Sequence, residues 1–165
     1  MKNLFLLVAI FYIAILLGGC NSMNSEIDVK AEKAAINKVI HNSIGWAANK
    51  DKELSYSCFA DDPELFWFSP EDEGTIYGFK SLVELTEGVF MRNEFKAIGY
   101  EIRELKINLS GSGDVAWYHA RLDDFNEWNG QPANWEDVRW TGVLEKRDGR
   151  WVIVQMHFSE PTGRQ

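Results

Sequence analysis

The run WYHARLDDF, residues 117–125, carries residue types suited to acid–base chemistry. His119, Arg121 and Asp123 alternate along it, so a β-strand would project all three from one face. In that arrangement Asp123 can act as a base, Arg121 can orient its carboxylate and His119 can donate a proton. Such a trio suits isomerisation or hydrolysis without a cofactor. The alternative for Arg121 and Asp123 is a partly buried salt bridge at the mouth of a pocket.

A second candidate for chemistry is His157, late in the apolar run WVIVQMHFS and two positions before Ser159. Its role depends on which face of a strand it occupies, and the turn at Asp148-Gly149 allows two registers. A two-residue loop leaves both faces of the hairpin mixed, whereas a three-residue loop that begins at Arg147 separates apolar from polar side chains. We expect the three-residue loop, so His157 should point away from the helices and have an interface or structural role.

The separated faces predict one pocket and one interface. The expected lining of the ligand pocket is Trp117, Trp140, Gly142, Val154, Met156 and Phe158, with the trio of residues 119, 121 and 123 on the same face. The expected interface or structural set is Arg139, Thr141, Gln155, His157 and Ser159. The three histidines have no metal-binding spacing and the chain has no dinucleotide or Walker motif, so we expect neither a metal nor a cofactor.

These side chains must be positioned by helices followed by strands. Apolar spacing predicts a helix from a capping box at Ser25 to about Asn49, a short helix over 51–59, a strand within 63–70 and a helix over 78–90. The period then changes, and long strands are predicted over 95–109, 115–125, 137–146 and 151–159. This order is typical of an α+β domain whose helices cover one face of a mainly antiparallel sheet.

Length and composition limit the classes of protein and of binding partner that are consistent with the sequence. A chain of 165 residues accommodates one domain with a sizeable core, and 45% hydrophobic residues with seven Trp and ten Phe indicate a globular protein. A net charge of −8 argues against nucleic acid as a partner, because binding to phosphates relies on Lys and Arg. Cys58 lies one helical turn after Leu54, which favours a buried thiol over a nucleophile.

The first 20 residues predict where in the cell the protein is located. A basic start at Lys2, an apolar run over 4–17 and the ending LLGGC are typical of a secretory signal, and the ending resembles the lipobox of bacterial lipoproteins. We therefore expect a signal peptide over 1–19, lipidation of Cys20, a short tether over 20–27 and one domain over 28–161. The expected location is the bacterial cell envelope, with the chain held to a membrane through its lipid and facing outside the cytoplasm.

The order of elements resembles the nuclear transport factor 2-like superfamily, which includes the SnoaL-like proteins. The sharpest match is TGVLEKRDGRWVIVQMHFS, residues 141–159, which is similar to the last hairpin of SnoaL-like domains and of the calcium/calmodulin-dependent kinase II association domain. The resemblance covers about residues 28–159 and implies a cone-shaped fold of three helices on a curved, mainly antiparallel sheet. Pocket arginines of the kinase domain match Arg121, Gly142 and Phe158, so two of the three charges are lost here.

This resemblance implies two functions. The first is a domain that binds a small, largely apolar molecule in a conical pocket, with or without cofactor-free isomerase or hydrolase chemistry. The alternative is a non-catalytic dimerisation or assembly module. A homodimer is expected in either case, because these folds commonly pair through the outer face of the sheet.

Overall fold

The structure is a computed structural model and describes residues 27–161. Its helical elements are α2 (Val29–Gly45), the 3-10 helix η1 (Trp46–Asn49), α3 (Lys52–Ser57), the 3-10 helix η2 (Asp72–Gly74), α4 (Phe79–Leu85) and the π-helical turn η3 (Thr86–Phe90). Its strands are β1 (Phe66–Phe68), β2 (Ile76–Tyr77), β3 (Phe95–Leu109), β4 (Val115–Trp128), β5 (Gln131–Pro132), β6 (Trp135–Arg147) and β7 (Arg150–Ser159). The signal peptide, Cys20 and most of the tether lie outside the described residues.

Helix α2 begins where a side chain satisfies its first free amide groups. The Asp28 carboxylate accepts from the backbone N–H of Lys30 at 3.1 Å and of Ala31 at 3.0 Å, so Asp28 is the N-cap of the helix. The predicted cap at Ser25 lies outside the described residues. Ile36 and Ile40, one helical turn apart, are fully buried against the sheet. The helix thus has one apolar face, as its spacing predicts.

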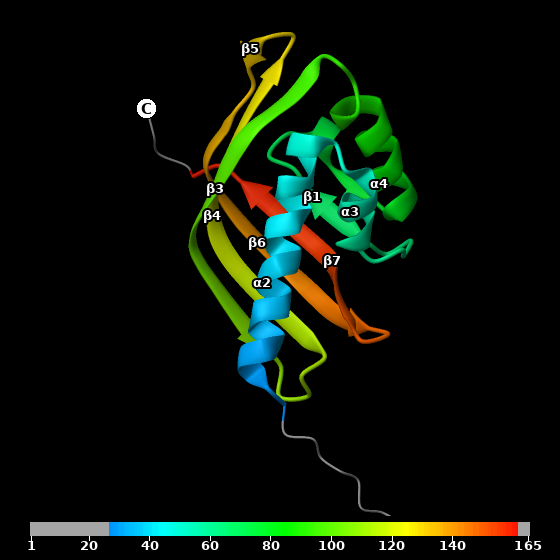
Figure 1. Cartoon of the computed structure of the whole chain (residues 1–165), viewed down its shortest axis with the longest axis vertical. Coiled ribbons are helices and arrows are strands. Elements are labelled where there is room, and N and C mark those ends of the chain that lie inside the picture. Colours follow the sequence, from blue (N-terminus) through cyan, green and yellow to red (C-terminus); the bar gives the residue numbers. More distant parts are fainter. Residues whose placement is uncertain (1–26, 162–165) are drawn as a thin grey trace, which may run out of the picture.

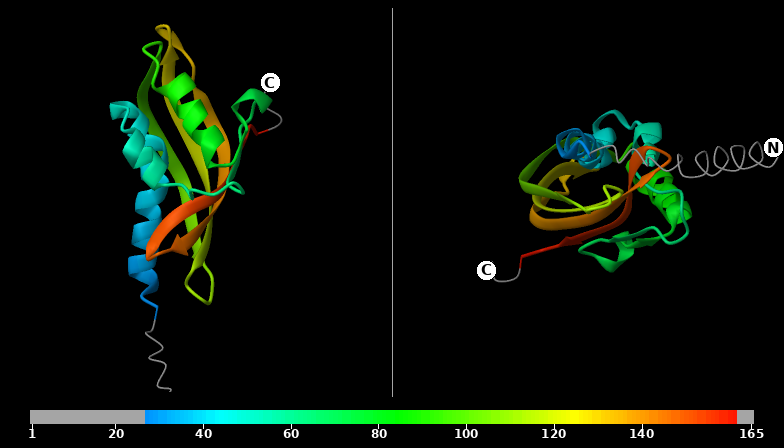
Figure 2. Two further views of the ribbon diagram at one scale, coloured as in Figure 1. Left: turned by 90° about the vertical axis from the view of Figure 1, so that its right-hand side faces the viewer. Right: turned by 90° about the horizontal axis from the view of Figure 1, so that it is seen from below.

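The sheet has the order β2-β1-β7-β6-β4-β3, with β5 paired to β4. All pairs are antiparallel except β1 with β7. The sheet curls around α2, and α3 and α4 lie beside the same concave side (Figures 1 and 2). The predicted α+β class, with three helices on a curved and mainly antiparallel sheet, is confirmed.

The β6–β7 hairpin differs from the prediction at its turn. Arg147 pairs with Arg150, so Asp148 and Gly149 form a two-residue loop, and both have positive φ (51° and 77°), as a type I′ turn requires. The predicted three-residue loop is wrong. The extra residue lies instead in β7, where Leu144 pairs with Ile153 and Val143 with Gln155, leaving Val154 as an unpaired β-bulge.

The bulge changes which side chains of β7 point inward. Before it, Trp151 and Ile153 are buried; after it, Met156 and Phe158 are buried. Trp140 then pairs with Phe158 and Thr141 with His157, so apolar residues face the helices and polar residues face outward beyond the bulge. The prediction for Val154 is wrong, because the bulge turns it toward a shallow hollow beside Gln155 and Val143.

Strand β4 presents the opposite face from the one predicted. Ala116, Tyr118, Ala120 and Leu122 are buried, so the even-numbered residues face the helices. The odd-numbered residues therefore face outward, and Trp117 is 47% exposed. The expectation that positions 117, 119, 121 and 123 share the face of the pocket is wrong, because the residues of β4 that lie under the helices are Ala116, Tyr118, Ala120 and Leu122.

Candidate functional site

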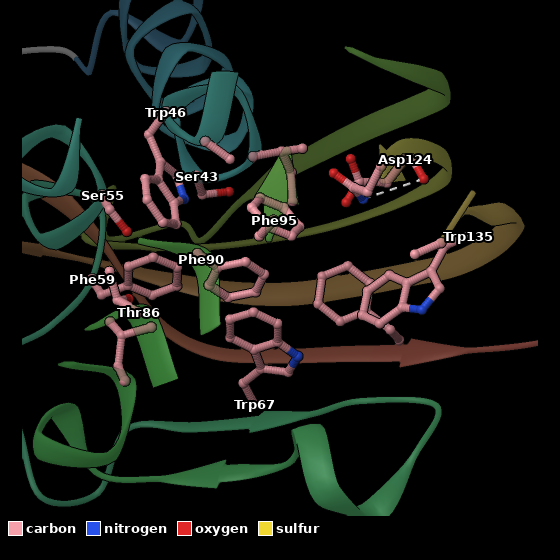
Figure 3. A pocket seen from close by; sticks show the side chains of 16 residues that line it. Ser43, Trp46, Ser55, Phe59, Trp67, Thr86, Phe90, Phe95, Asp124 and Trp135 are labelled. Atoms are coloured by element: carbon pink, nitrogen blue, oxygen red, sulfur yellow. Dashed lines mark hydrogen bonds between the residues drawn. The ribbon is translucent and has the colours of Figure 1, made fainter. Parts of the chain in front are cut away.

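A cavity of about 180 Å³ lies between the end of α2 and the sheet. Helical segments, loops and five strands contribute to its wall, and Figure 3 shows their side chains pointing toward a common space. The lining residues are Ser43, Ile44, Trp46, Ala47, Ser55, Phe59, Trp67, Leu82, Thr86, Phe90, Phe95, Asp124, Asn126, Ala133, Trp135 and Phe158. Seven of these sixteen side chains are aromatic, so the cavity suits a flat or compact apolar molecule.

The rings that line the cavity pack against one another in two groups. Phe158 lies 5.6 Å from Trp67 and 5.2 Å from Trp135, measured between ring centroids. On another part of the wall, Phe90 lies 5.7 Å from Trp46 and 5.1 Å from Phe95. Edge-to-face and tilted contacts of this kind hold each ring in place, so the shape of the cavity is set before any ligand enters.

Asp124 places a carboxyl group in this wall. It is an inward-facing residue of β4, paired with Tyr100 on one side and Trp135 on the other. Burial raises the pKa of the Asp124 carboxyl above its usual value, because the charged form loses its hydration. A titratable group with a perturbed pKa in a cavity is a candidate for binding or proton transfer. Within residues 27–161, no Lys, Arg or His forms an ion pair with Asp124.

Further polar atoms in the wall are buried without a hydrogen-bond partner among the described residues. They include Oγ of Ser55 and Nε1 of Trp67. Ser55 lies with Thr86 across the cavity from Asp124, and Trp67 lies between the two sides (Figure 3). Because an unpaired buried donor or acceptor costs about 1–3 kcal/mol, a ligand that bonds to either atom would regain that energy.

The predicted trio lies outside the cavity. Arg103 donates to both carboxylate oxygens of Asp123, at 3.0 and 2.9 Å, and Arg121 makes an ion pair of 3.6 Å with Asp137. His119 is exposed on the same outer face. A catalytic site of His119, Arg121 and Asp123 in the pocket is therefore excluded by their direction, and Arg103 is the bidentate partner of Asp123.

Of the six predicted pocket residues, Phe158 lines the cavity. Trp140 and Met156 are buried in the core beneath it, at 0% and 1% exposure. The space beside Gly142 is filled by the Tyr118 ring, because a Cβ added at Gly142 would lie 2.6 Å from Cε1 of that ring. Gly142 therefore gives room to a core side chain and not to a ligand.

The predicted interface set lies on the outer face. His157 pairs with Thr141 on β6 and with Phe68 on β1, and its ring lies 5.9 Å from that of Phe68. Arg139, Thr141 and His157 are exposed, and Gln155 and Ser159 are half-buried. Phe68 and Tyr77 add exposed aromatic surface next to this set, at 41% and 65% exposure. A catalytic role for His157 in the cavity is excluded, while its role in an interface stays a prediction.

Sequence reasoning missed most of the cavity wall. Asp124 directly follows Asp123, which was the predicted site residue, and the two neighbouring carboxylates point to opposite faces of β4. The signal that could have found it is the alternation of Ala116, Ala120 and Leu122, which marks even positions as inward. Trp46, Trp67 and Trp135 come from separate segments, and local periodicity gives no sign that they converge.

This arrangement is similar to that of known proteins. The model of the SnoaL-like domain family matches residues 36–163. A nuclear transport factor 2-like superfamily protein from Salmonella enterica is 22% identical, with a TM-score of 0.70 over 82% of this chain and 95% of that one.

Two other solved structures have related folds. A putative aromatic ring hydroxylase from Novosphingobium aromaticivorans is 11% identical, with a TM-score of 0.66 over 81% of this chain and 91% of that one. The association domain of CaMKII from C. elegans is 23% identical, with a TM-score of 0.58 over 79% of this chain and 97% of that one. At these levels of identity, the similarity shows a shared fold. Within residues 27–161, no helix is long and apolar enough to span a membrane.

Proposed function

The chain belongs to the SnoaL-like domain family, and on that basis we propose that it binds a small, largely apolar molecule in the aromatic cavity. The fold is one that binds small ligands or serves as an isomerase or assembly module. The observation that supports binding is a cavity wall with seven aromatic rings and with unpaired polar atoms at Ser55 and Trp67. An engineered cavity of about 150 Å³ binds benzene, so a cavity of this size suits one ring with a short substituent.

A pair of neighbouring alanines offers a matched test of this proposal. Ala47 lines the cavity, whereas Ala48, the next residue of η1, is exposed. Ala47→Leu should fill part of the cavity and weaken binding of a one-ring probe such as 2-phenylethanol at least tenfold by calorimetry. Ala48→Leu should leave the affinity unchanged. Equal affinities for both variants and for the unmodified protein would place the probe elsewhere and refute the proposal.

The raised pKa of Asp124 favours a second candidate, cofactor-free proton transfer. In an isomerase or hydrolase of this fold, Asp124 would take a proton from the bound molecule or give one to it. Any turnover of the molecule that co-purifies with the protein should then be lost in Asp124→Asn. Asp123→Asn, whose side chain lies on the other face, is the comparison variant. Turnover that persists in Asp124→Asn would leave binding as the function.

The assembly alternative is favoured by the outer face of the sheet. Phe68, Tyr77 and Trp117 are exposed there, on the same face as His157 and Thr141. Pairing of two copies through this face would bury these rings. Phe68→Glu should then convert a homodimer to a monomer in light scattering, while Val29→Glu, which changes a residue equally exposed on α2, should not. If the unmodified protein is a monomer in light scattering, this homodimer is excluded.

We also propose that the chain is lipid-anchored at Cys20 to a membrane of the bacterial cell envelope. The support is the basic start, apolar run and LLGGC ending of its first 20 residues. Cys20→Ser should abolish labelling by a radioactive fatty acid and release the protein from the membrane fraction. Cys58→Ser, which changes the other cysteine, is the control and should keep the label.

A further inference from the structure

We propose that the cavity selects a compact organic cation, a one-ring or short-chain amine whose ammonium group pairs with Asp124 while its apolar part contacts the rings. This proposal rests on the proposed function, because it names the class of ligand for the same cavity. It adds a positively charged group to the small, largely apolar ligand that the sequence suggests.

The balance of charge in the wall is the first argument. Of the sixteen side chains that line the cavity, Asp124 is the one that carries a formal charge, and none is Lys, Arg or His. Burial raises the pKa of its carboxyl group because the ionised form loses hydration, and the neutral Asn126 side chain offsets that rise only in part. A buried carboxylate is stabilised most by a cation that enters the same low-dielectric space. An anionic ligand would add a second like charge and is disfavoured.

The rings provide the second argument, which is independent of the carboxylate. The face of an aromatic ring is electron-rich and attracts cations, most strongly in Trp. Three of the seven rings are Trp46, Trp67 and Trp135, and the packing between rings leaves several of them lining the same space. Trp135 is the β6 partner of Asp124, so an ammonium group at Asp124 would lie beside at least one of these rings. The wall and the carboxylate favour the same sign of charge in the ligand.

The net charge of the chain also favours a cationic ligand, because it acts at longer range than the contacts in the cavity. At −8, the protein attracts cations and repels anions before they reach the cavity. On the far side of the cavity, Oγ of Ser55 is buried without a partner among the described residues. A ring hydroxyl on the ligand could bond there, which fits a molecule that is cationic at one end and weakly polar at the other.

Three one-ring probes of similar size separate the charge classes: 2-phenylethylamine, 2-phenylethanol and phenylacetate. On the full-length protein at pH 7, calorimetry should find the amine at least tenfold tighter than the alcohol, which corresponds to about 1.4 kcal/mol, and the carboxylate weakest. Asp124→Asn should remove the preference for the amine and change the affinity for the alcohol less than about twofold. Glu127→Gln removes one charge from the outer face of the same strand and should keep the preference.

A pH titration of the unmodified protein tests the same pairing if Asp124→Asn does not fold. Protonation of Asp124 removes the negative charge, so the affinity for the amine should fall on acidification while that for the alcohol stays constant. Equal affinities for amine and alcohol at pH 7 would overturn this inference and leave the proposed function standing. Tightest binding of the carboxylate would also overturn it. Failure of all three probes to bind would count against both this inference and the proposed binding function.

Discussion

Replacement of Phe158 by Ala should both destabilise the domain and enlarge its cavity. The ring is 1% exposed and contacts the rings of Trp67, Trp135 and Trp140, at centroid distances of 5.6, 5.2 and 5.5 Å. Loss of a buried Phe side chain costs about 3–5 kcal/mol. One side of this ring already borders the cavity and makes fewer contacts, so we expect a cost near 3 kcal/mol.

The neighbouring residue gives the control for this prediction. His157 is exposed on the other face of β7, so His157→Ala should change the free energy of unfolding by less than about 0.5 kcal/mol. Urea denaturation followed by Trp fluorescence measures both changes, and the melting temperature of Phe158→Ala should fall by about 6–12 °C. In calorimetry, Phe158→Ala should accept a two-ring probe such as 2-naphthaleneethanol that the unmodified protein excludes. Equal costs at the two positions, or continued exclusion of the larger probe, would refute the assignment of faces.

Three more changes test the packing and the charges around the site. Gly142→Ala would bring a Cβ to 2.6 Å from the Tyr118 ring, so we expect a loss of about 1–3 kcal/mol in urea denaturation, and an unchanged midpoint would contradict it. A hydrogen bond from Lys146 lowers the pKa of Glu32. The stability that this ionised carboxylate adds is therefore present above the unfolded pKa of about 4.3 and is lost as the pH falls through the folded pKa. Glu32→Gln should make the free energy of unfolding depend less on pH in acid, and identical acid curves for the two proteins would argue against the ion pair. Burial raises the pKa of the Cys58 thiol to about 11, so iodoacetamide should label the native protein slowly at pH 8 and faster as the pH approaches 11, whereas rapid labelling at pH 8 would show that the thiol is accessible.

The fold was accessible from the sequence because its signals are local. The apolar period of α2 and the bounds of β3 at Phe95 and Leu109 follow from residue spacing, and the order of the elements then leaves few topologies. The long strands were predicted near their observed limits. The loop at Asp148-Gly149 has the composition of a type I′ turn, and the error there was to place the extra residue in the loop.

The site was less accessible because its geometry depends on where strands lose their regular pairing. Bulges at Val154 and near Asp137 shift the pairing of β6, and no local pattern specifies a bulge. In β4 the alternating side chains of Trp117 and His119 suggested a pocket, yet the inward face of that strand is formed by Ala116, Tyr118, Ala120 and Leu122. The wall of the cavity joins segments from Ser43 to Phe158, and such convergence is a property of the tertiary fold.

The bulge at Val154 gives β7 one residue more than the stretch of β6 that it pairs with. Residues 153 and 155 each pair with neighbours on both sides of β7, whereas Val154 pairs with neither. A different side chain at 154 would leave the rest of the strand in place. Removal of the residue would restore an unbroken alternation, in which Ile153, Met156 and Phe158 still point inward, and would cost the strand only its local bend. In genomes, this strand should therefore tolerate both substitution and loss of residue 154, whereas loss of residue 157 would move Phe158 to the solvent side.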